Sequence, residues 1–324
     1  MASDPTPEGA LTPREFRTHV EPVAAALRKV VRAARTDRPD SFLPDASSPA
    51  MREMADQLMF HGSDEGVIDV SQALTSQRLK AGEDHVLAVC DLWLVDNETY
   101  VWSVPVLGRA ALEAFALVFH LCDPNVARTV RAGRTMNELI YSAQAVDQLP
   151  RDMKRPSNRV DFRIDQVDSM GLQRQMTTKG KLTPWFEEVR PSYRAAVKAL
   201  FGDEDLGDAL YNFWSAVAHG SSWGLSETLG EVEHDASAAA FRAPIVLSIE
   251  TVMTTAAVLA LGHRRVVERL AQWSGWSTET HGTRYDELAS MYADHLSQRQ
   301  VGPEAAPQAS TAFSGATLWT PPTP

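Results

Sequence analysis

The chain has 324 residues, of which 44% are hydrophobic and 23% charged, and its formal net charge is −11 at pH 7. The hydrophobic fraction suffices for a large packed core and argues against a disordered chain. The negative charge argues against a general nucleic-acid binder, because such proteins neutralise phosphates with a surplus of lysine and arginine. Cys90 and Cys122 lie in apolar stretches without a C-x-x-C spacing, so we expect no metal and no cofactor.

Targeting signals are scarce in this sequence. The first residues lack the basic region and the apolar core of a secretory signal peptide. The most apolar long stretch, 243–262, contains Glu250 and several threonine and serine hydroxyls, which is typical of a buried core helix rather than of a membrane span. We therefore expect a cytoplasmic protein without a membrane association.

Helix-start signals recur along the chain. Thr-Pro-Arg-Glu at 12–15 has the form of a capping box with proline at the first helical position. Ser-Pro at 48–49 and Asp-Pro at 123–124 repeat the cap-then-proline pattern, and Asp235 precedes a long alanine-rich run. The apolar periodicity then predicts helices over 12–36, 48–60, 68–80, 83–95, 99–122, 124–148, 158–176, 184–201, 204–219, 235–273 and 280–298.

These elements predict an all-α, multi-helix bundle. The nearest approach to the alternation of a strand is at 99–106, where a short strand stays an alternative. We divide the chain into an N-terminal helical segment (1–82), a main helical bundle (83–298) and a disordered tail (299–324). The polar, proline-containing stretch 149–159 is a candidate seam within the bundle.

The predicted helix around Leu107–Cys122 is apolar on nearly every side, which is typical of a central helix. At 100° per residue, Arg109, Glu113 and His120 nevertheless fall within about 40° of one another. Buried charges without partners cost several kcal/mol, so this stripe must find counter-charges or line a wet cleft. A structural ion pair and a functional cleft are both compatible with the sequence.

The predicted helix 204–219 has one apolar face and one face rich in Tyr, Asn, Ser and His. Tyr211, Ser215 and His219 lie on the polar face, and His219 stands at the helix C-terminus, where the dipole favours a positive charge. Ser215 and His219 are one turn apart and can form a nucleophile–base pair, although no G-x-S-x-G elbow accompanies them. A purely hydrogen-bonded role for this face remains the alternative.

A third predicted helix, 125–148, carries Arg131 and Glu138 along one side. It follows the Arg109 helix after a tight Asp-Pro turn, so the two helices are expected to be neighbours whose polar faces meet. Together they predict a pocket rich in arginine, glutamate and histidine. Paired E-x-x-H motifs of di-iron bundles, H-E-x-x-H, P-loop and dinucleotide-binding motifs are all absent from the sequence.

Three segments carry a resemblance to known proteins: 109–113 (RAALE), the helix 125–142, and 215–220 (SAVAHG). With these segments, residues 85–270 resemble a family of uncharacterised helical proteins from actinobacteria, which implies a helical fold and no particular activity. More remotely, the chain is similar to the HEPN superfamily, all-helical domains that are often ribonucleases in toxin and phage-defence systems. Active HEPN members carry Arg, four residues and then His, whereas Trp214 precedes His219 at that spacing and only Arg14 and His19 match it.

We expect a helical protein that binds a small anionic ligand or a protein partner through a polar cleft within the bundle, and the sequence does not decide whether it is an enzyme. The expected binding residues are Arg109, Glu113, His120, Arg131, Glu138 and Tyr211, and the catalytic candidates are His219, Ser215 and Glu113. One alternative is a HEPN-like ribonuclease, with His219 as general acid or base and Arg131 or Arg109 stabilising phosphate charge; only this alternative involves nucleic acid. The other alternative is a homo-oligomeric assembly protein whose seam includes the apolar run 236–270.

Overall fold

The computed structural model of the chain describes residues 13–38, 42–61, 63–94, 102–148, 159–202, 204–219, 233–235, 240–242 and 249–300. Its helices are α1 (Pro13–Asp37), α2 (Pro49–Ala55), α3 (Val67–Leu94), α4 (Ser103–Leu121), α5 (Arg128–Val146), α6 (Val160–Ser169), α7 (Tyr193–Phe201), α8 (Glu204–Ala218), α10 (Ile249–Ser274) and α11 (Glu279–Gln300). Strands β1 (Arg174–Met176) and β2 (Leu182–Phe186) form one antiparallel pair, and β3 (Glu233–Asp235) and β4 (Ala240–Arg242) form another. The predicted all-α class is confirmed.

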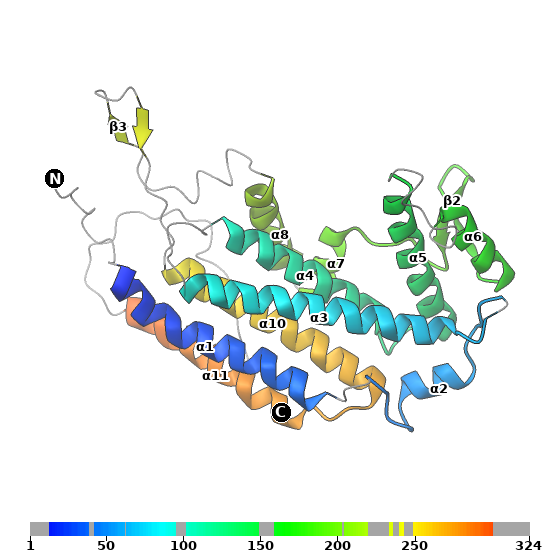
Figure 1. Ribbon diagram of the computed structural model, residues 1–324, viewed down its shortest axis with the longest axis horizontal. Helices are drawn as coiled ribbons and strands as arrows, with labels where there is room; N and C mark the ends of the chain where they lie inside the picture. The colour runs from blue at the N-terminus through cyan, green and yellow to red at the C-terminus, as the bar shows by residue number, and fades with distance from the viewer. Residues whose placement is uncertain are drawn as a thin grey trace.

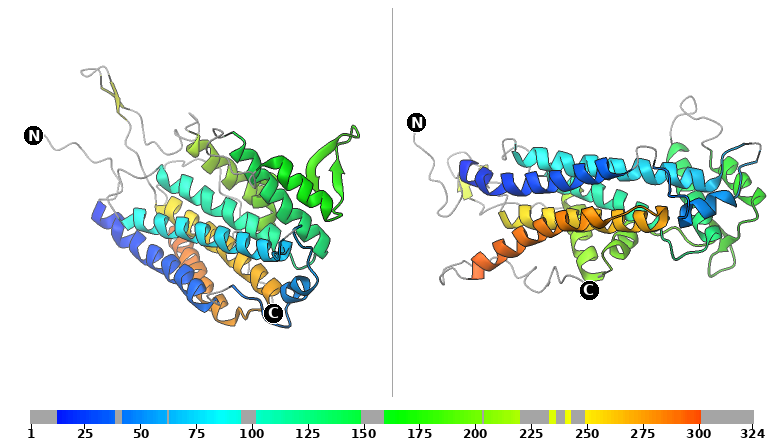
Figure 2. Two further views of the ribbon diagram at one scale, coloured as in Figure 1. Left: turned by 45° about the vertical axis from the view of Figure 1, so that its right-hand side comes forward. Right: turned by 90° about the horizontal axis from the view of Figure 1, so that it is seen from below.

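The long helices lie in two layers. Seen from below, α1 and α3 form one layer, while α10 and α11 form the other (Figure 2). Helix α1 lies beside α11 at one side of the bundle, and α5, α6 and the β1–β2 hairpin stand together at the far end of α3 (Figure 1). Helix α4 packs against α3, α7, α8 and α10 and is therefore the central element of the bundle.

Helix α4 carries the strongest apolar character. Of the helices in the described ranges, it alone is long and apolar enough, by length and composition, to cross a membrane. However, 61% of its most apolar window is buried inside the protein. Phe115 and Ala116 on this helix have no exposed surface. This burial is typical of the core helix of a soluble protein.

The segments 68–80 and 83–95, predicted as two helices, are one continuous helix, α3. Gly82 lies in the predicted gap between the two segments, and its role is to allow close packing. A Cβ atom on Gly82 would lie 2.5 Å from Cε1 of Phe115 on α4. The missing side chain thus lets α3 and α4 approach each other, and the backbone of α3 continues unbroken.

Of the two cap-then-proline patterns that predicted helix starts, one is confirmed and one was wrong. The side chain of Ser48 caps α2 by accepting a hydrogen bond from the amide of Met51, as the Ser-Pro pattern predicted. The Asp-Pro pattern at 123–124 was wrong as a helix start, because α5 begins only at Arg128. Instead, the Asp123 carboxylate accepts from the amide of Asn125 and stabilises a turn.

Three predicted helices were wrong in part. Residues 174–176 and 182–186 form the β1–β2 hairpin rather than helix ends, and 235 and 240–242 belong to the β3–β4 pair. The β2 strand is held by a distant partner: the side chain of Asn137 on α5 bonds both the amide and the carbonyl of Phe186. The alternative of a strand at 99–106 is replaced by helix from Ser103 onward.

The predicted domain boundary at 82 falls inside α3. Residues on both sides of this position share both hydrophobic cores: Val86 packs with α1 in the larger core, and Phe60 packs with Met136 in the smaller one. Residues 149–158 of the candidate seam and 301–324 of the predicted tail lie outside the described residues, and α11 extends to Gln300.

A buried carboxylate connects four helices of the main core. Glu83 of α3 is 0% exposed, and its Oε2 accepts from Nε of Arg35 at 2.8 Å and from Nη2 of Arg38 at 2.7 Å. Its Oε1 lies 2.9 Å from Nε2 of His263 on α10, and Nδ1 of that ring lies 2.9 Å from the Tyr285 hydroxyl on α11. We call these five residues the Glu83 network. Burial opposes ionisation of Glu83, but His263 and Arg38 outweigh it and lower its pKa from 4.5 to about 2.

We predict that Glu83→Gln destabilises the fold by about 3 kcal/mol, because the buried guanidinium group of Arg38 loses its counter-charge and the part-exposed Arg35 keeps only Asp84. Chemical denaturation near neutral pH measures this loss. Since the folded-state pKa lies below 4.5, the contribution of Glu83 is complete above pH 4.5 and is lost as the pH falls toward about 2. The variant should therefore lose stability less steeply in that range.

The matched control is Glu287→Gln, which removes one carboxylate from an exposed pair with Lys29 (56% and 61% of the side chains exposed). Exposed pairs contribute little, so this variant should unfold within about 0.5 kcal/mol of the wild type. Equal denaturation midpoints for both variants would show that the Glu83 network does not stabilise the fold.

Candidate functional site

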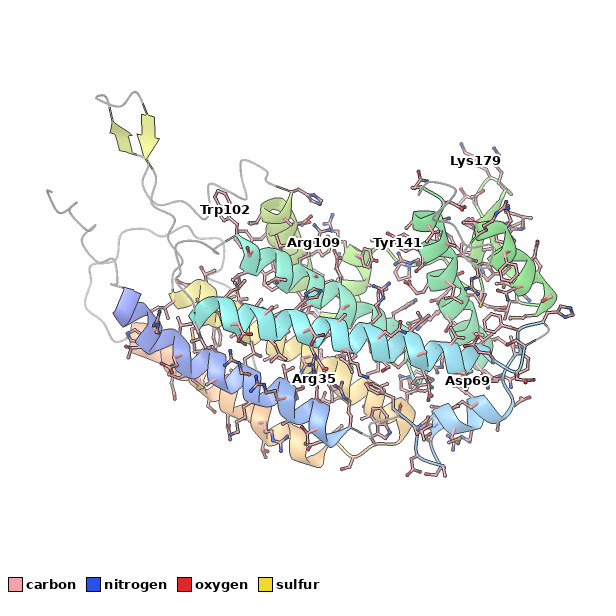
Figure 3. The ribbon with its side chains drawn as sticks, viewed as in Figure 1. Arg35, Asp69, Trp102, Arg109, Tyr141 and Lys179 are labelled. Carbon is pink, nitrogen blue, oxygen red and sulfur yellow. The ribbon has the colours of Figure 1, made fainter. Side chains whose placement is uncertain are left out.

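Four of the predicted site residues meet between α4 and the C-terminal part of α8. Figure 3 labels Arg109, which lies on α4. Arg109 Nε donates to Glu113 Oε1 at 2.8 Å, its Nη2 donates to the Tyr211 hydroxyl at 3.3 Å, and its Nη1 lies 3.1 Å from Nε2 of His219. The Tyr211 hydroxyl donates to Glu113 Oε1 at 3.2 Å. We call Arg109, Glu113, Tyr211 and His219 the α4–α8 cluster. The guanidinium group at its centre is held by three side chains.

Local structure explains why the cluster forms. Arg109 and Glu113 are one turn apart on α4, and Tyr211 and His219 lie on the polar face of α8 or at its end. The two helices can approach because Gly108 has no side chain: a Cβ there would lie 2.9 Å from Cζ3 of Trp214. Trp214 is 3% exposed, so the apolar face of α8 is buried and its polar face is presented beside Arg109.

The charges of the α4–α8 cluster follow from these contacts. Burial opposes the charge of Arg109, but the hydrogen bonds and charges of Glu113 and Tyr211 together outweigh it and raise the pKa of the guanidinium group. Burial, followed by the charge of Glu113, raises the pKa of Tyr211, so its hydroxyl keeps its proton. Because arginine is only a donor, Nε2 of His219 is the acceptor in their contact. The cluster thus joins a cation, an anion, a phenol and an imidazole.

Ser215 does not complete a nucleophile pair. Its backbone carbonyl accepts from the amide of His219 at 3.0 Å, but no hydrogen bond joins its hydroxyl to the His219 ring among the contacts of the described residues. The ring nitrogen Nε2 faces Arg109 instead. The predicted serine–histidine arrangement is therefore not formed in this conformation.

Arg131 and Glu138 are not part of the α4–α8 cluster, contrary to the single cleft expected from three helices. Arg131 is fully buried and forms a two-pronged ion pair with Glu53 (2.6 and 3.1 Å), while its guanidinium group stacks on Trp273. Glu138 pairs with Arg190 at 2.6 Å, and each side chain is 5% exposed. Both are closed ion pairs that join elements distant in sequence, so their geometry indicates a structural role.

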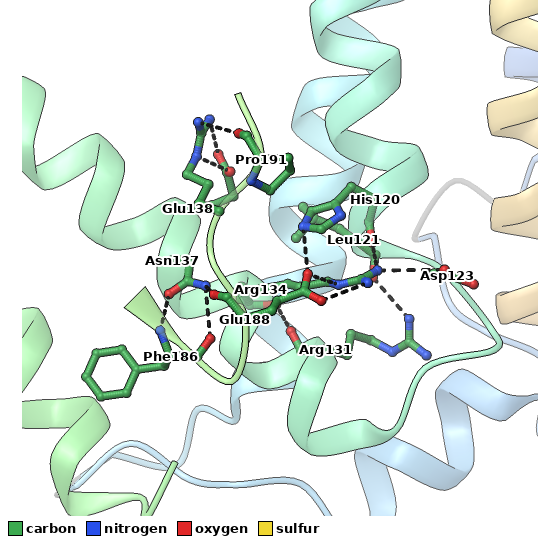
Figure 4. Close-up of polar contacts among 12 residues, drawn as sticks. His120, Leu121, Asp123, Arg131, Arg134, Asn137, Glu138, Phe186, Glu188 and Pro191 are labelled. Atoms are coloured by element: carbon green, nitrogen blue, oxygen red, sulfur yellow. Dashed lines mark hydrogen bonds and ion pairs between the residues drawn. The ribbon is translucent and has the colours of Figure 1, made fainter. Parts of the chain in front are cut away.

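His120 is also separated from the α4–α8 cluster, although it shares a stripe of α4 with Arg109. Eleven residues separate the two, which at the rise of an α-helix is about 16 Å. The His120 ring lies 3.3 Å from Oε1 of Glu188 and faces a recess next to Arg134 (Figure 4). Arg134, Glu188 and Arg269 of this recess were not among the predicted site residues, and no local pattern connects these three distant positions.

Metal chemistry has no visible basis in the described residues. They contain no group of three or more His, Cys, Asp or Glu side chains that could hold a metal ion. Cys90 and Cys122 are buried, and burial raises the pKa of each thiol to about 12. Both thiols are therefore protonated at neutral pH and are poor nucleophiles and poor ligands.

Comparison with known proteins assigns neither a family nor a function to the chain. No protein-family model, no curated protein and no solved structure matches the chain. The resemblances to an actinobacterial family and to HEPN domains therefore rest on the quoted residues alone. Any function must be argued from the chemistry of the α4–α8 cluster and the His120 recess.

We predict that Gly108→Ala separates α4 from α8 and destabilises the protein by about 1–3 kcal/mol, because the added methyl group overlaps the Trp214 ring. Thermal unfolding monitored by circular dichroism measures the change. Gly282→Ala on α11 is the control, since nothing lies within 4 Å of a Cβ there and alanine favours the helix. A Gly108→Ala variant as stable as Gly282→Ala would contradict the close contact.

Proposed function

We propose that the protein binds a small anionic ligand at the α4–α8 cluster. The observation that carries the proposal is the state of Arg109: three side chains hold its guanidinium group, yet its side chain keeps 19% of its surface exposed. A fixed guanidinium group is well suited to bind carboxylate or phosphate oxygens, because its orientation is set before the ligand arrives.

The cluster has donors left for a ligand. A guanidinium group has five N–H donors, and the contacts with Glu113, Tyr211 and His219 use three of them. His219 is exposed and follows the last residue of α8, so its ring can move toward an anion and donate to it. Glu113 offsets one positive charge, which favours a small anion over a highly charged polyanion. We also propose a cytoplasmic location, in line with two reduced, buried thiols.

Cleavage of RNA is the second candidate function, and the 3.1 Å contact between Arg109 and His219 favours it. An exposed imidazole beside a guanidinium group can act as general acid or base while the cation stabilises the developing phosphate charge. In such a reaction, Glu113 takes the 2′-hydroxyl proton and the 2′ oxygen bonds to phosphorus. The bond between phosphorus and the 5′ oxygen breaks, and His219 in its protonated form gives a proton to the leaving 5′ oxygen. The net charge of −11 counts against RNA binding.

The homo-oligomer alternative has no comparable support. The apolar side chains of α10, such as Val258, Leu259 and Val266, are buried within one chain. They pack in the main core, where α10 contacts α1, α4 and α7. The apolar length of this helix is thus explained without a partner subunit.

We predict that Arg109→Gln weakens the binding of inorganic phosphate at least about tenfold, because the variant loses a charge-assisted donor pair. Isothermal titration calorimetry on the full chain measures the affinity. Arg284→Gln is the matched control, since Arg284 also forms a part-exposed ion pair, with Asp37, but on the α11 side of the bundle. Unchanged phosphate affinity in Arg109→Gln, or an equal loss in Arg284→Gln, would refute the proposed site.

Labelled RNA separates the two candidate functions. If the cluster cleaves RNA, the wild type should release fragments and His219→Ala should not. Cleavage that survives in His219→Ala would remove His219 from the mechanism, and no cleavage of any RNA tested would leave the binding function.

A further inference from the structure

An opening lies among α4, α5, α7 and α10, at the opposite end of α4 from Arg109. It is a half-open recess of about 290 Å³. Its polar side chains are His120, Asp123, Arg134, Glu188 and Arg269. Its apolar wall is formed by Ala116, Phe119, Val189, Pro191, Ala195, Ala196 and Ala199. We call this opening the His120 recess.

One side of the recess is rigid because its ions are already paired (Figure 4). Arg134 Nε and Nη2 donate to the two oxygens of Glu188 at 2.6 and 3.2 Å, and its Nη1 donates to the carbonyl of His120 at 2.6 Å. The backbone carbonyl of Glu188 accepts in turn from Asn137 at 2.9 Å. Arg134 and Glu188 therefore form a fixed floor and have little capacity to bind a ligand.

Arg269 is the group with spare capacity. Its guanidinium group stacks on the Phe119 ring at 3.4 Å, and its Nη1 donates to the Phe119 carbonyl at 3.2 Å and lies 3.5 Å from Asp123. Its Nε and Nη2 donate no hydrogen bond to any of the described residues. Burial lowers the pKa of Arg269, and although Asp123 opposes this effect, the charge is only partly compensated.

The His120 ring reports the same electrostatic imbalance. Burial, followed by the charges of Arg134 and Arg190, lowers the pKa of His120 to about 3, and Asp123 only partly opposes this. The ring is therefore neutral at physiological pH. Glu188 is already paired with Arg134, so the unused N–H donors of Arg269 are the groups that face the recess, and an anion is the complementary ligand.

We propose that the His120 recess binds a small organic monocarboxylate, whose carboxylate group accepts from Arg269 and whose short apolar part lies against Ala195, Ala196 and Ala199. The volume corresponds to about ten water molecules, which limits the ligand to a small molecule. A dianion such as phosphate fits less well, because Asp123 and Glu188 lie in the same recess and repel a second negative charge.

The test compares propionate with propionamide, its uncharged isostere, by ligand-observed NMR titration on the full chain. We expect saturable binding of propionate and at least about tenfold weaker binding of propionamide, since the amide lacks the charge that Arg269 recognises. Equal binding of the two compounds, or no saturable binding of propionate, would overturn the proposal.

Two variants locate the binding. Arg269→Gln should weaken propionate binding at least about tenfold, whereas Arg264→Gln, on another side of the same helix and paired with Glu268, should not change it. Ala199→Phe keeps every charge but fills the mouth of the recess, and should also abolish binding. Ala199 is exposed, so this variant decides the question even if Arg269→Gln does not fold.

The result is independent of the function proposed for the α4–α8 cluster. Loss of propionate binding in Arg109→Gln, with normal binding in Ala199→Phe, would show that propionate binds at the α4–α8 cluster. This outcome would refute the proposed binding at the His120 recess. Normal propionate binding in Arg109→Gln supports the recess, whatever happens to phosphate binding in the same variant.

Discussion

The architecture depends on one buried carboxylate. Glu83 is fully enclosed and ionised, and burying an isolated charge would cost more than the whole fold can supply. Its three donors come from α1, from Arg38 directly after α1, and from α10. Tyr285 of α11 contacts His263 in turn, so the geometry of the network sets how these helices lie along α3. Apolar contacts alone tolerate sliding between helices, whereas a carboxylate with three fixed donors does not. The Glu83 network thus specifies one arrangement of the bundle around α4.

That arrangement leaves α4 with ionisable side chains at both ends of an otherwise buried helix. The two ends of α4 accommodate these ionisable side chains in different ways. At Arg109 the cation is held by side chains of α4 and α8 and keeps part of its surface open to solvent. At His120 the imidazole stays neutral among arginines that α5 and α10 provide. Arg109 has unused donors on a part-exposed side chain, and Arg269 has unused donors at the His120 recess, and this is why we propose anion binding at each.

Parts of the candidate site were visible in the sequence and parts were not. Arg109 and Glu113 are one turn apart, and Tyr211 and His219 stand on a face whose residue types are unusual for solvent, so their proximity could be anticipated. The partners of Arg131 and Glu138 could not be anticipated. Glu53 and Arg190 lie far away in the sequence, and no local pattern indicates that they pair so closely.

The sequence by itself determined the helical class, the central position of the Arg109–His120 helix and several helix starts, because these depend on interactions within a few residues. Only the tertiary structure decided that Gly82 and Gly108 are contact points, that 174–186 is a hairpin, and that the polar residues divide between the α4–α8 cluster and the His120 recess. The physical reason is how far apart in the sequence the interacting residues lie. Periodicity and capping act between neighbours along the chain, whereas ion pairs and close helix contacts depend on how separate helices pack, which short-range patterns do not encode.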